Sequence, residues 1–166
     1  RSLSKINTGS GNRRIIKGLE SESASMQEAL ENVALAASSG QPVLIVGETG
    51  TGKSVIARSI HQLSRRKTAP FITYQPRYGS PDLVSSELFG HQKGAFTGAS
   101  EQRRGLVEEA ERGTLFLDEV DELPPETQLL LLGVLQEGVF RRLGLNKELN
   151  SDFRLVTATN RPVEVV

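Results

Sequence analysis

The segment from Gly47 to Ser54 has residue types and a spacing that can bind phosphate. It fits the pattern G-x-x-x-x-G-K-[ST], with the residues Gly47, Glu48, Thr49, Gly50, Thr51, Gly52, Lys53 and Ser54. Glycines let backbone N–H groups turn toward phosphate oxygens, and the N-terminus of a following helix adds positive potential. Lys53 would then reach the β- and γ-phosphates of a nucleotide, and the Ser54 hydroxyl would ligate Mg²⁺.

The flanks of this segment agree with that chemistry. The apolar run from Pro42 to Val46 predicts a buried strand, and the run from Val55 to His61 predicts the start of a helix. The alternative is a glycine-rich turn that joins a strand to a helix and binds nothing. Because strand, loop and helix stand in the required order, we favour the phosphate-binding interpretation.

Two adjacent acids give a second chemical signal. Asp118 and Glu119 follow the mostly apolar stretch from Thr114 to Leu117, which predicts a buried strand. Ligands of open parallel sheets bind at the carboxyl ends of strands. Asp118 is therefore placed to hold Mg²⁺, and Glu119 to orient and polarise an attacking water. Two solvated acids at a strand end are the alternative, which a preceding phosphate-binding loop disfavours.

Asn160 follows a further apolar stretch, Phe153 to Thr159, which also predicts a strand. Its amide would then point from a strand end toward the phosphates, where it could hold the lytic water or sense the γ-phosphate. A simple turn at Asn160 before Pro162 remains an equal alternative at this stage.

Stretches with strand and helix periodicity alternate along the chain. We expect strands at 42–46, 71–74, 114–117 and 153–159, and helices at 26–37, 55–63, 83–89, 106–110 and 124–138. Such alternation predicts an α/β fold with a parallel sheet. Residues 1–14 are polar and without periodicity, so we expect a linker or arm followed by one unit at 15–166.

Composition sets further bounds. The 166 residues suffice for one domain with a core, and 20 basic and 20 acidic residues cancel, so no nucleic-acid or membrane surface is indicated. The chain has no cysteine, which excludes disulfides and thiolate metal sites. We expect neither a membrane span nor a signal peptide. His61 and His91 are isolated from other metal ligands in sequence, so we interpret both as structural or surface residues.

The hexapeptide Gly94, Ala95, Phe96, Thr97, Gly98 and Ala99 lies between the second predicted strand and the acidic one. It resembles the signature loop of bacterial sigma-54-dependent transcription activators, the NtrC-type enhancer-binding proteins of the AAA+ class. The flanks Ser86–His91 and Gly113–Glu119 agree, as does Ala158–Arg161. The resemblance extends from about Ile15 to Arg161.

This resemblance implies an AAA+ P-loop NTPase of three layers, α/β/α, that uses ATP and Mg²⁺. It implies a ring, usually hexameric, in the bacterial cytoplasm, which remodels the closed complex of sigma-54 RNA polymerase. DNA would be bound only through a domain outside this chain, and no membrane is involved. A helical lid and arginine fingers would lie beyond Arg161.

The resemblance also implies roles for single residues. Asp118 and Glu119 resemble the Walker B acids, and Asn160 resembles sensor I. The hexapeptide would contact sigma-54, with Phe96 as an exposed apolar anchor, although its sequence context alone predicts a core residue. The remaining implied positions are Ile15 and Ile16, near the adenine, and Leu143 to Ser151, a second surface loop.

Three departures from the family pattern bear on function. Gln75 stands where the family has an Asn that contacts the Walker B glutamate, and Pro76 follows it. Gly133 interrupts a predicted helix. The family's fifth strand would lie after Arg161, so we expect an unpaired apolar edge at Val43–Val46. A nucleotide-binding interaction module with little hydrolysis is therefore an alternative function, and a different AAA+ remodeller is a third.

Overall fold

The computed structural model describes residues 7–9, 13–17, 23–48, 50, 52–76 and 80–161, with side chains from residue 30 onward. Within these ranges a central sheet of six strands has the order β1 (Asn7–Gly9), β2 (Arg13–Lys17), β3 (Val43–Val46), β10 (Arg154–Thr159), β7 (Thr114–Leu117) and β4 (Phe71–Tyr74). The five strands β2, β3, β10, β7 and β4 are parallel, and β1 is antiparallel to β2. The four strands predicted from sequence are β3, β4, β7 and β10.

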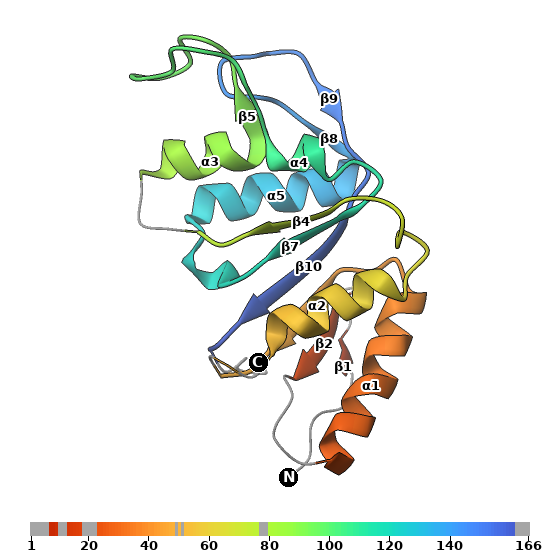
Figure 1. Ribbon diagram of the computed structural model, residues 1–166. Helices are drawn as coiled ribbons and strands as arrows, with labels where there is room; N and C mark the ends of the chain where they lie inside the picture. Colours follow the sequence, from red (N-terminus) through yellow and green to blue (C-terminus); the bar gives the residue numbers. More distant parts are fainter. Residues whose placement is uncertain are drawn as a thin grey trace.

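Helices cover both faces of the sheet (Figure 1). One face carries α1 (Ser23–Ser38) and α2 (Lys53–Gln62). The other carries α3 (Pro81–Phe89), α4 (Leu106–Glu109) and α5 (Pro125–Glu137). The chain leaves β3 for the far strand β4 and then returns through β7 to β10. Because parallel connections are right-handed, this reversal of direction puts the later helices on the opposite face from α2.

Alternating side chains of the buried strands supply two cores, one on each face. Leu115 and Leu117 of β7 pack with α3, α4 and α5, while Phe116 between them packs with α1 and α2. β10 divides in the same way, with Leu155 on the α5 face and Val156 on the α2 face. This period of two supplies both layers, and the parallel pairing of β10 with β3 and β7 brings the carboxyl ends of these strands together.

The expected unpaired edge at β3 is wrong. β2 pairs with β3 in parallel, with Ile15 opposite Leu44 and Ile16 opposite Ile45. The backbone groups of β3 are therefore bonded on both sides, and β1 and β4 form the two edges of the sheet. Part of the stretch expected to be a polar arm is thus in the sheet. The Ile15–Ile16 pair carried the only sequence signal for this strand.

Short strands connect the helical layer to two surface loops. β5 (Gly90–His91) pairs with β6 (Arg103–Arg104), and β8 (Val139–Phe140) pairs with β9 (Leu149–Asn150). The segment 143–151, expected to be a loop, therefore ends in a strand. The two histidines are buried and structural, as expected: His61 contacts Thr114, and His91 contacts Ser86.

Among the described helices, none has the length and apolar character needed to cross a membrane.

Candidate active site

The predicted phosphate-binding loop follows β3 directly and ends at α2. Gly50 and Gly52 have φ of +85° and +82°, a left-handed conformation that favours glycine. α2 begins at Lys53 without a side-chain cap, so its first backbone N–H groups can bind an anion. Thr49 and Thr51, which belong to the same predicted loop, lie outside the described residues.

The Lys53 ammonium is folded onto the loop. Nζ donates to the carbonyl oxygen of Gly47 at 2.7 Å and to that of Glu48 at 2.9 Å. These contacts place the positive charge over the turn, where phosphate oxygens would compete with the two carbonyls. On the other side of β3, β2 brings the backbone of Ile15 and Ile16 beside this strand. Their side chains are not described, so their proximity to an adenine stays a prediction.

The acids expected at the end of β7 are where the sequence predicted them. Asp118 is half-buried, and its backbone N–H donates to the carbonyl oxygen of Tyr74 at 2.9 Å. Its Oδ1 accepts from the N–H of Glu119 at 2.9 Å. Glu119 is also half-buried and has φ 53° and ψ 49°. It opens a short 3₁₀ turn, η1 (Val120–Glu122).

Gln75 reaches the second of these acids. Its Nε2 donates to Oε2 of Glu119 at 2.8 Å. The side chain extends from the residue after β4, which is paired with β7, so the two groups start on neighbouring strands. The additional methylene relative to Asn therefore does not prevent the contact that the family pattern implies.

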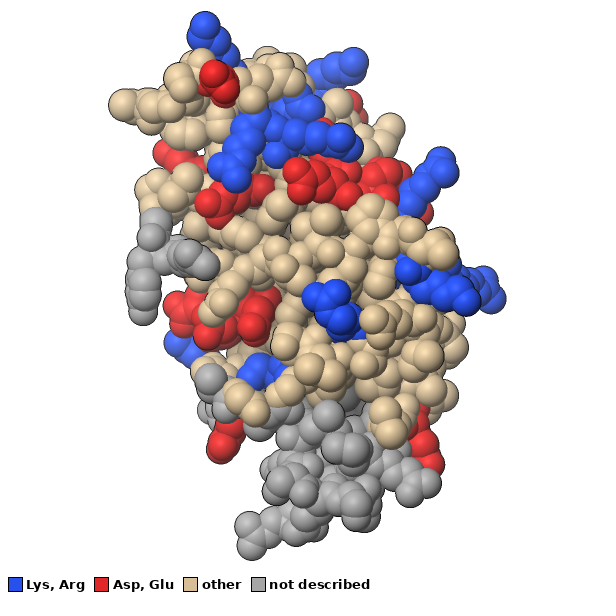
Figure 2. All heavy atoms as spheres, in the orientation of Figure 1, with Lys and Arg blue, Asp and Glu red and all other residues tan. Residues whose placement is uncertain are grey.

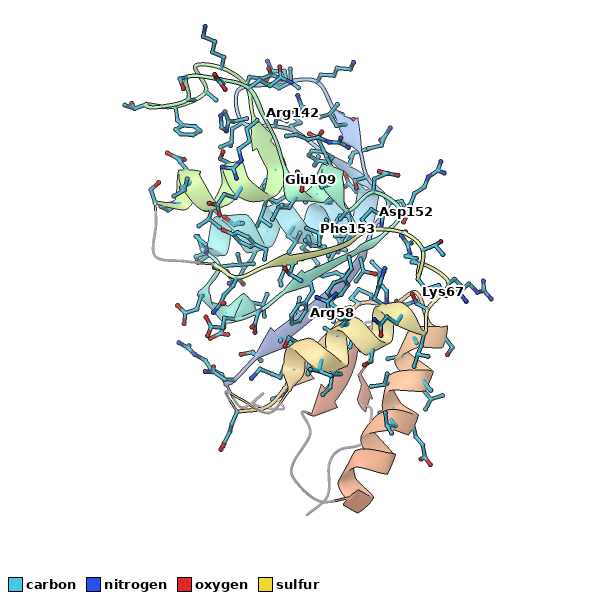
Figure 3. The ribbon with its side chains drawn as sticks, in the orientation of Figure 1. Arg58, Lys67, Glu109, Arg142, Asp152 and Phe153 are labelled. Carbon is cyan, nitrogen blue, oxygen red and sulfur yellow. The ribbon has the colours of Figure 1, made fainter. Side chains whose placement is uncertain are left out.

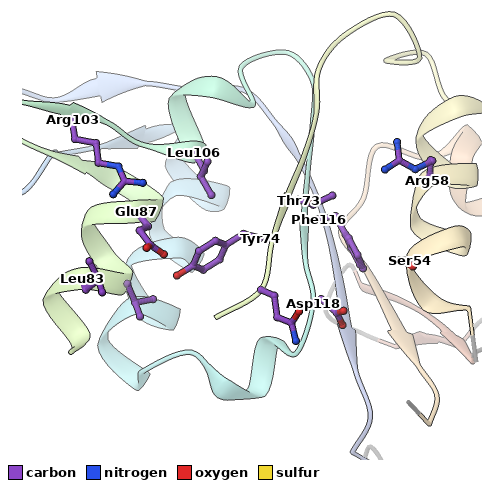
Figure 4. A pocket seen from close by; sticks show the side chains of 12 residues that line it. Ser54, Arg58, Thr73, Tyr74, Leu83, Glu87, Arg103, Leu106, Phe116 and Asp118 are labelled. Carbon is purple, nitrogen blue, oxygen red and sulfur yellow. The ribbon is translucent and has the colours of Figure 1, made fainter. Parts of the chain in front are cut away.

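Ser54, Gln75 and Asp118 line one cavity of about 690 Å³, whose wall continues to Tyr74 and Glu87 (Figure 4). A hydroxyl and a carboxylate are hard oxygen donors of the kind Mg²⁺ prefers. Within the described part of the chain no group of three His, Cys, Asp or Glu side chains could hold a metal ion alone. These donors therefore fit a magnesium ion whose other ligands are phosphate and water oxygens.

The cavity contains a contact that sequence reasoning missed. The Tyr74 ring, on β4, points toward the Glu87 carboxylate on α3 (Figure 4). Burial raises the pKa of the Tyr74 phenol, and the Glu87 carboxylate adds to this effect. The phenol therefore remains protonated at neutral pH. Because Tyr74 precedes Gln75 and packs against the core that contains Val84 and Leu88, it connects the strand beside Glu119 to α3.

Asn160 lies at the carboxyl end of β10 and is exposed. The preceding residue, Thr159, accepts a hydrogen bond from the N–H of Gly47 through its carbonyl oxygen, at 3.2 Å. The end of β10 is thus joined to the first residue of the phosphate-binding loop. This contact brings Asn160 to the edge of the sheet at which the loop begins.

The hexapeptide forms a closed excursion at the far end of the molecule (Figure 1). The N–H of Gly94 donates to the carbonyl oxygen of Ala99 at 2.8 Å, and Gly94 and Gly98 have φ of +81° and +96°. Thr97 is exposed, but Phe96 is half-buried, in contrast to the expected exposed anchor. The His91 and Phe96 rings form a T-shaped contact, with centroids 5.1 Å apart and an interplanar angle of 75°.

The hexapeptide loop and the second surface loop are joined at their bases. The N–H of Gln92 donates to the carbonyl oxygen of Leu143 at 2.9 Å. Arg142, which Figure 3 labels, donates to both carboxylate oxygens of Glu108 on α4, at 2.6 and 2.9 Å. This hydrogen bonding raises the pKa of Arg142. Basic and acidic side chains gather at this end of the molecule (Figure 2). No local pattern predicts the pairing of Arg142 with Glu108, which are 34 positions apart.

Comparison with known families decides the classification. The model of the sigma-54 interaction domain family matches residues 19–166. The chain belongs to this family. This match confirms the resemblance to sigma-54-dependent activators that the hexapeptide and the acidic strand indicated. The parallel order of β2, β3, β10, β7 and β4 confirms the predicted α/β fold.

Curated relatives of this sigma-54 interaction domain are transcriptional regulators. The Nif-specific regulatory protein of Herbaspirillum seropedicae is 53% identical over 142 residues, which are 86% of this chain and 26% of the relative. The transcriptional regulator VasH of Vibrio cholerae is 45% identical over 163 residues, 96% of this chain and 31% of the relative. The chain thus spans about a quarter to a third of the length of these relatives.

A solved structure has the same arrangement. NtrX from Brucella abortus in complex with ATP is 33% identical, with a TM-score of 0.76 over 87% of this chain and 31% of the NtrX chain. The same protein has also been solved in complex with ADP, with 33% identity and a TM-score of 0.77. These likenesses support the α/β fold of this chain, and the nucleotides in these structures are bound to NtrX.

Proposed function

We propose that this sigma-54 interaction domain binds ATP with Mg²⁺ and hydrolyses it at the carboxyl ends of β3, β7 and β10. The observation that carries the proposal is that Ser54 and Asp118 line one cavity, while Lys53 lies at the start of the helix that bears Ser54. Glu119 adjoins Asp118 and is held by a neighbouring amide. The ATP complex of NtrX supports the choice of nucleotide.

The phosphate-binding loop supplies most of the binding. Phosphate oxygens would take the N–H groups at the start of α2 and replace the carbonyls of Gly47 and Glu48 as partners of Lys53. Ser54 and Asp118 would hold Mg²⁺, which neutralises charge on the phosphates. Glu119 would then orient the attacking water, and Asn160 would contact either that water or the γ-phosphate.

The free energy of ATP hydrolysis would be used at the hexapeptide loop. We propose that residues 94–99 contact sigma-54 in the closed complex of RNA polymerase, with Thr97 exposed for that contact. Gln75 donates a hydrogen bond to Glu119, and Tyr74, which precedes Gln75, faces α3. Helix α3 continues through β5 into the loop. A change at Glu119 therefore has a short, packed route to residues 94–99.

The proposal also includes the oligomeric state, the cellular compartment and the binding of DNA. A homo-oligomeric ring, usually hexameric in this family, would place a neighbouring subunit beside each nucleotide. The bacterial cytoplasm is the compartment where sigma-54 RNA polymerase is found. DNA would be bound through a separate domain of the longer protein.

The alternative is a module that binds nucleotide and partner but hydrolyses little. Its support is the hydrogen bond that engages Oε2 of Glu119, because a carboxylate oxygen held by Gln75 has less capacity to accept from a water. Turnover measured with saturating ATP separates the two functions. A rate no higher than that of Glu119→Gln would favour the binding module.

The proposed function predicts that two variants separate nucleotide binding from partner binding. Lys53→Ala should abolish ATP binding in calorimetry, since it removes the cation of the loop, whereas the exposed control Lys67→Ala should bind normally. Thr97→Ala should bind ATP but lose capture of sigma-54 in the presence of ADP and aluminium fluoride. Thr68→Ala, also exposed, is its control.

Two results would contradict these expectations. Unchanged ATP affinity in Lys53→Ala would remove the phosphate-binding assignment. Retained sigma-54 capture in Thr97→Ala would remove the hexapeptide loop from the mechanism.

A further inference from the structure

Glu119 has a backbone conformation that its surroundings must maintain. In the described part of the chain, Glu119 and Arg112 are the residues other than glycine with positive φ. This left-handed region is disfavoured for residues with a Cβ. The N–H of Glu119 donates to Asp118, and its carbonyl oxygen accepts from the N–H of Glu122 at 2.9 Å. Whatever anchors η1 therefore also sets where the Glu119 carboxylate lies.

Asp121, in the middle of η1, is this anchor. Its Oδ1 accepts from the Thr159 hydroxyl at 2.7 Å, and its Oδ2 lies 2.9 Å from Nε of Arg161. Only 21% of the side chain is exposed, and both of its oxygens are engaged. Thr159 and Arg161 are the two neighbours of Asn160. The Asp121 carboxylate thus holds the residues on both sides of Asn160. Asp121 itself belongs to the turn that begins at Glu119.

The same contacts continue to the phosphate-binding loop. The Thr159 hydroxyl accepts from the N–H of Arg161 at 3.1 Å, and the Thr159 carbonyl oxygen accepts from the N–H of Gly47. Figure 2 shows acidic side chains gathered where η1 leaves the sheet. Asp121 is bonded both to β10 and to the residue that follows Asn160.

We propose that Asp121 is a positioning residue that sets Glu119 and Asn160 at the separation hydrolysis requires. The inference rests on the proposed ATP hydrolysis at this site. Arg161 is 70% exposed, and an ion pair with so exposed a partner contributes little to stability. Misplacement of a catalytic group, in contrast, lowers rates strongly. Asp121 therefore affects turnover far more than it affects nucleotide affinity.

The test measures ATP turnover by the full-length protein. Asp121→Ala should lower kcat by about tenfold or more. KM for ATP, and the affinity for a fluorescent ADP analogue, should stay within about twofold because the phosphate-binding loop is intact. Asp121→Asn keeps an oxygen that can accept from Thr159 and should recover part of the rate. In a Glu119→Gln background Asp121→Ala should lower kcat by a smaller factor than it does in the wild type, because part of its effect acts through Glu119.

The matched control is Asp152→Ala. Asp152 pairs with Arg66 at 3.0 Å and lies away from the cavity (Figure 3). Its removal also deletes a partly exposed ion pair, so kcat should be unchanged. If Asp121→Ala does not fold, Asp121→Asn and Arg161→Gln replace it in the test. For both variants kcat should fall while the affinity for the ADP analogue is unchanged.

Three results would overturn the positioning role: an unchanged kcat in Asp121→Ala, an equal further loss in the Glu119→Gln background, or a loss of ADP affinity that matches the loss of kcat. These three criteria apply when the wild-type protein hydrolyses ATP and this hydrolysis requires Lys53. A wild type that does not hydrolyse ATP overturns the proposed function, and this inference with it.

Discussion

Gln75 contacts Glu119 although its side chain is one methylene longer than the Asn that the family pattern has at this position. β4 and β7 are paired up to Tyr74 and Leu117, so the residues after them leave the sheet side by side. The left-handed turn at Glu119 then directs its carboxylate within 2.8 Å of the Gln75 amide. The backbone at Glu119 thus accommodates the longer amide.

At this scale we predict that Gln75→Ala separates nucleotide binding from partner capture. A hydrogen bond to a charged group is worth about 1.5–3 kcal/mol, so its loss should reduce sigma-54 capture by about tenfold or more. ADP affinity should change by less than about twofold, because the phosphate-binding loop is untouched. Gln75→Asn keeps an amide and should retain capture. The exposed Gln62→Ala is the control, and normal capture by Gln75→Ala would contradict the prediction.

Among the elements, α5 shows most clearly what a sequence pattern leaves open. The sequence predicts a broad apolar face, and the structure buries a stripe that includes Leu131 and Val134. Leu129, however, is 70% exposed, and Leu132 borders an apolar groove against β3 and β10. A helix with leucines on several sides can pack in several rotations. Its neighbours, the sheet and α3, select the rotation.

Two glycines of α5 should respond oppositely to the same substitution. A Cβ at Gly133, within the helix, would meet no heavy atom within 4 Å, so Gly133→Ala should stabilise the protein by about 0.5–1 kcal/mol. Gly138 ends the helix with φ 73°, so Gly138→Ala should destabilise it by about 1 kcal/mol. Urea unfolding measures both changes. A loss of stability in Gly133→Ala would show that the helix has no room at this position.

At the scale of the whole molecule, His61 connects two layers. It lies on α2, its Nδ1 is 2.8 Å from the Thr114 hydroxyl on β7, and its Nε2 is 3.1 Å from the carbonyl oxygen of Ala69. Burial lowers the pKa of His61, and the Arg58 and Arg154 charges add to this effect, although the Ala69 carbonyl opposes it. The folded state therefore holds neutral imidazole, with Nε2 donating to Ala69 and Nδ1 accepting from Thr114.

This burial predicts a stability that depends on pH. Since the folded pKa lies below the unfolded value of 6.5, the unfolded state binds the proton first as the pH falls. The contribution of His61 is complete above about pH 6.5 and decreases below it, by at most about 1.4 kcal/mol per pH unit. Urea unfolding between pH 7.5 and 5 measures the slope. His61→Gln should reduce it, and equal slopes in both proteins would contradict the assignment.

The sequence by itself determined the parts whose chemistry depends on contiguous residues. A phosphate-binding loop is built from neighbouring backbone N–H groups, so Gly47 to Ser54 predicts it without reference to the rest of the chain. The same holds for the buried strand that ends in Asp118 and Glu119. Short apolar runs predicted these four strands, because such a run is a local pattern.

Only the tertiary structure decided which distant residues meet. Gln75 and Glu119 are 44 positions apart, Thr159 and Asp121 are 38 apart, and Arg142 and Glu108 are 34 apart. The pairing of β2 with β3 likewise depends on backbone groups that any residue carries. Local patterns set which residues form strands and turns, but the order of strands in the sheet places their ends together. The distance between Glu119 and Asn160 is therefore set by the fold, through the contacts that Asp121 makes with Thr159 and Arg161.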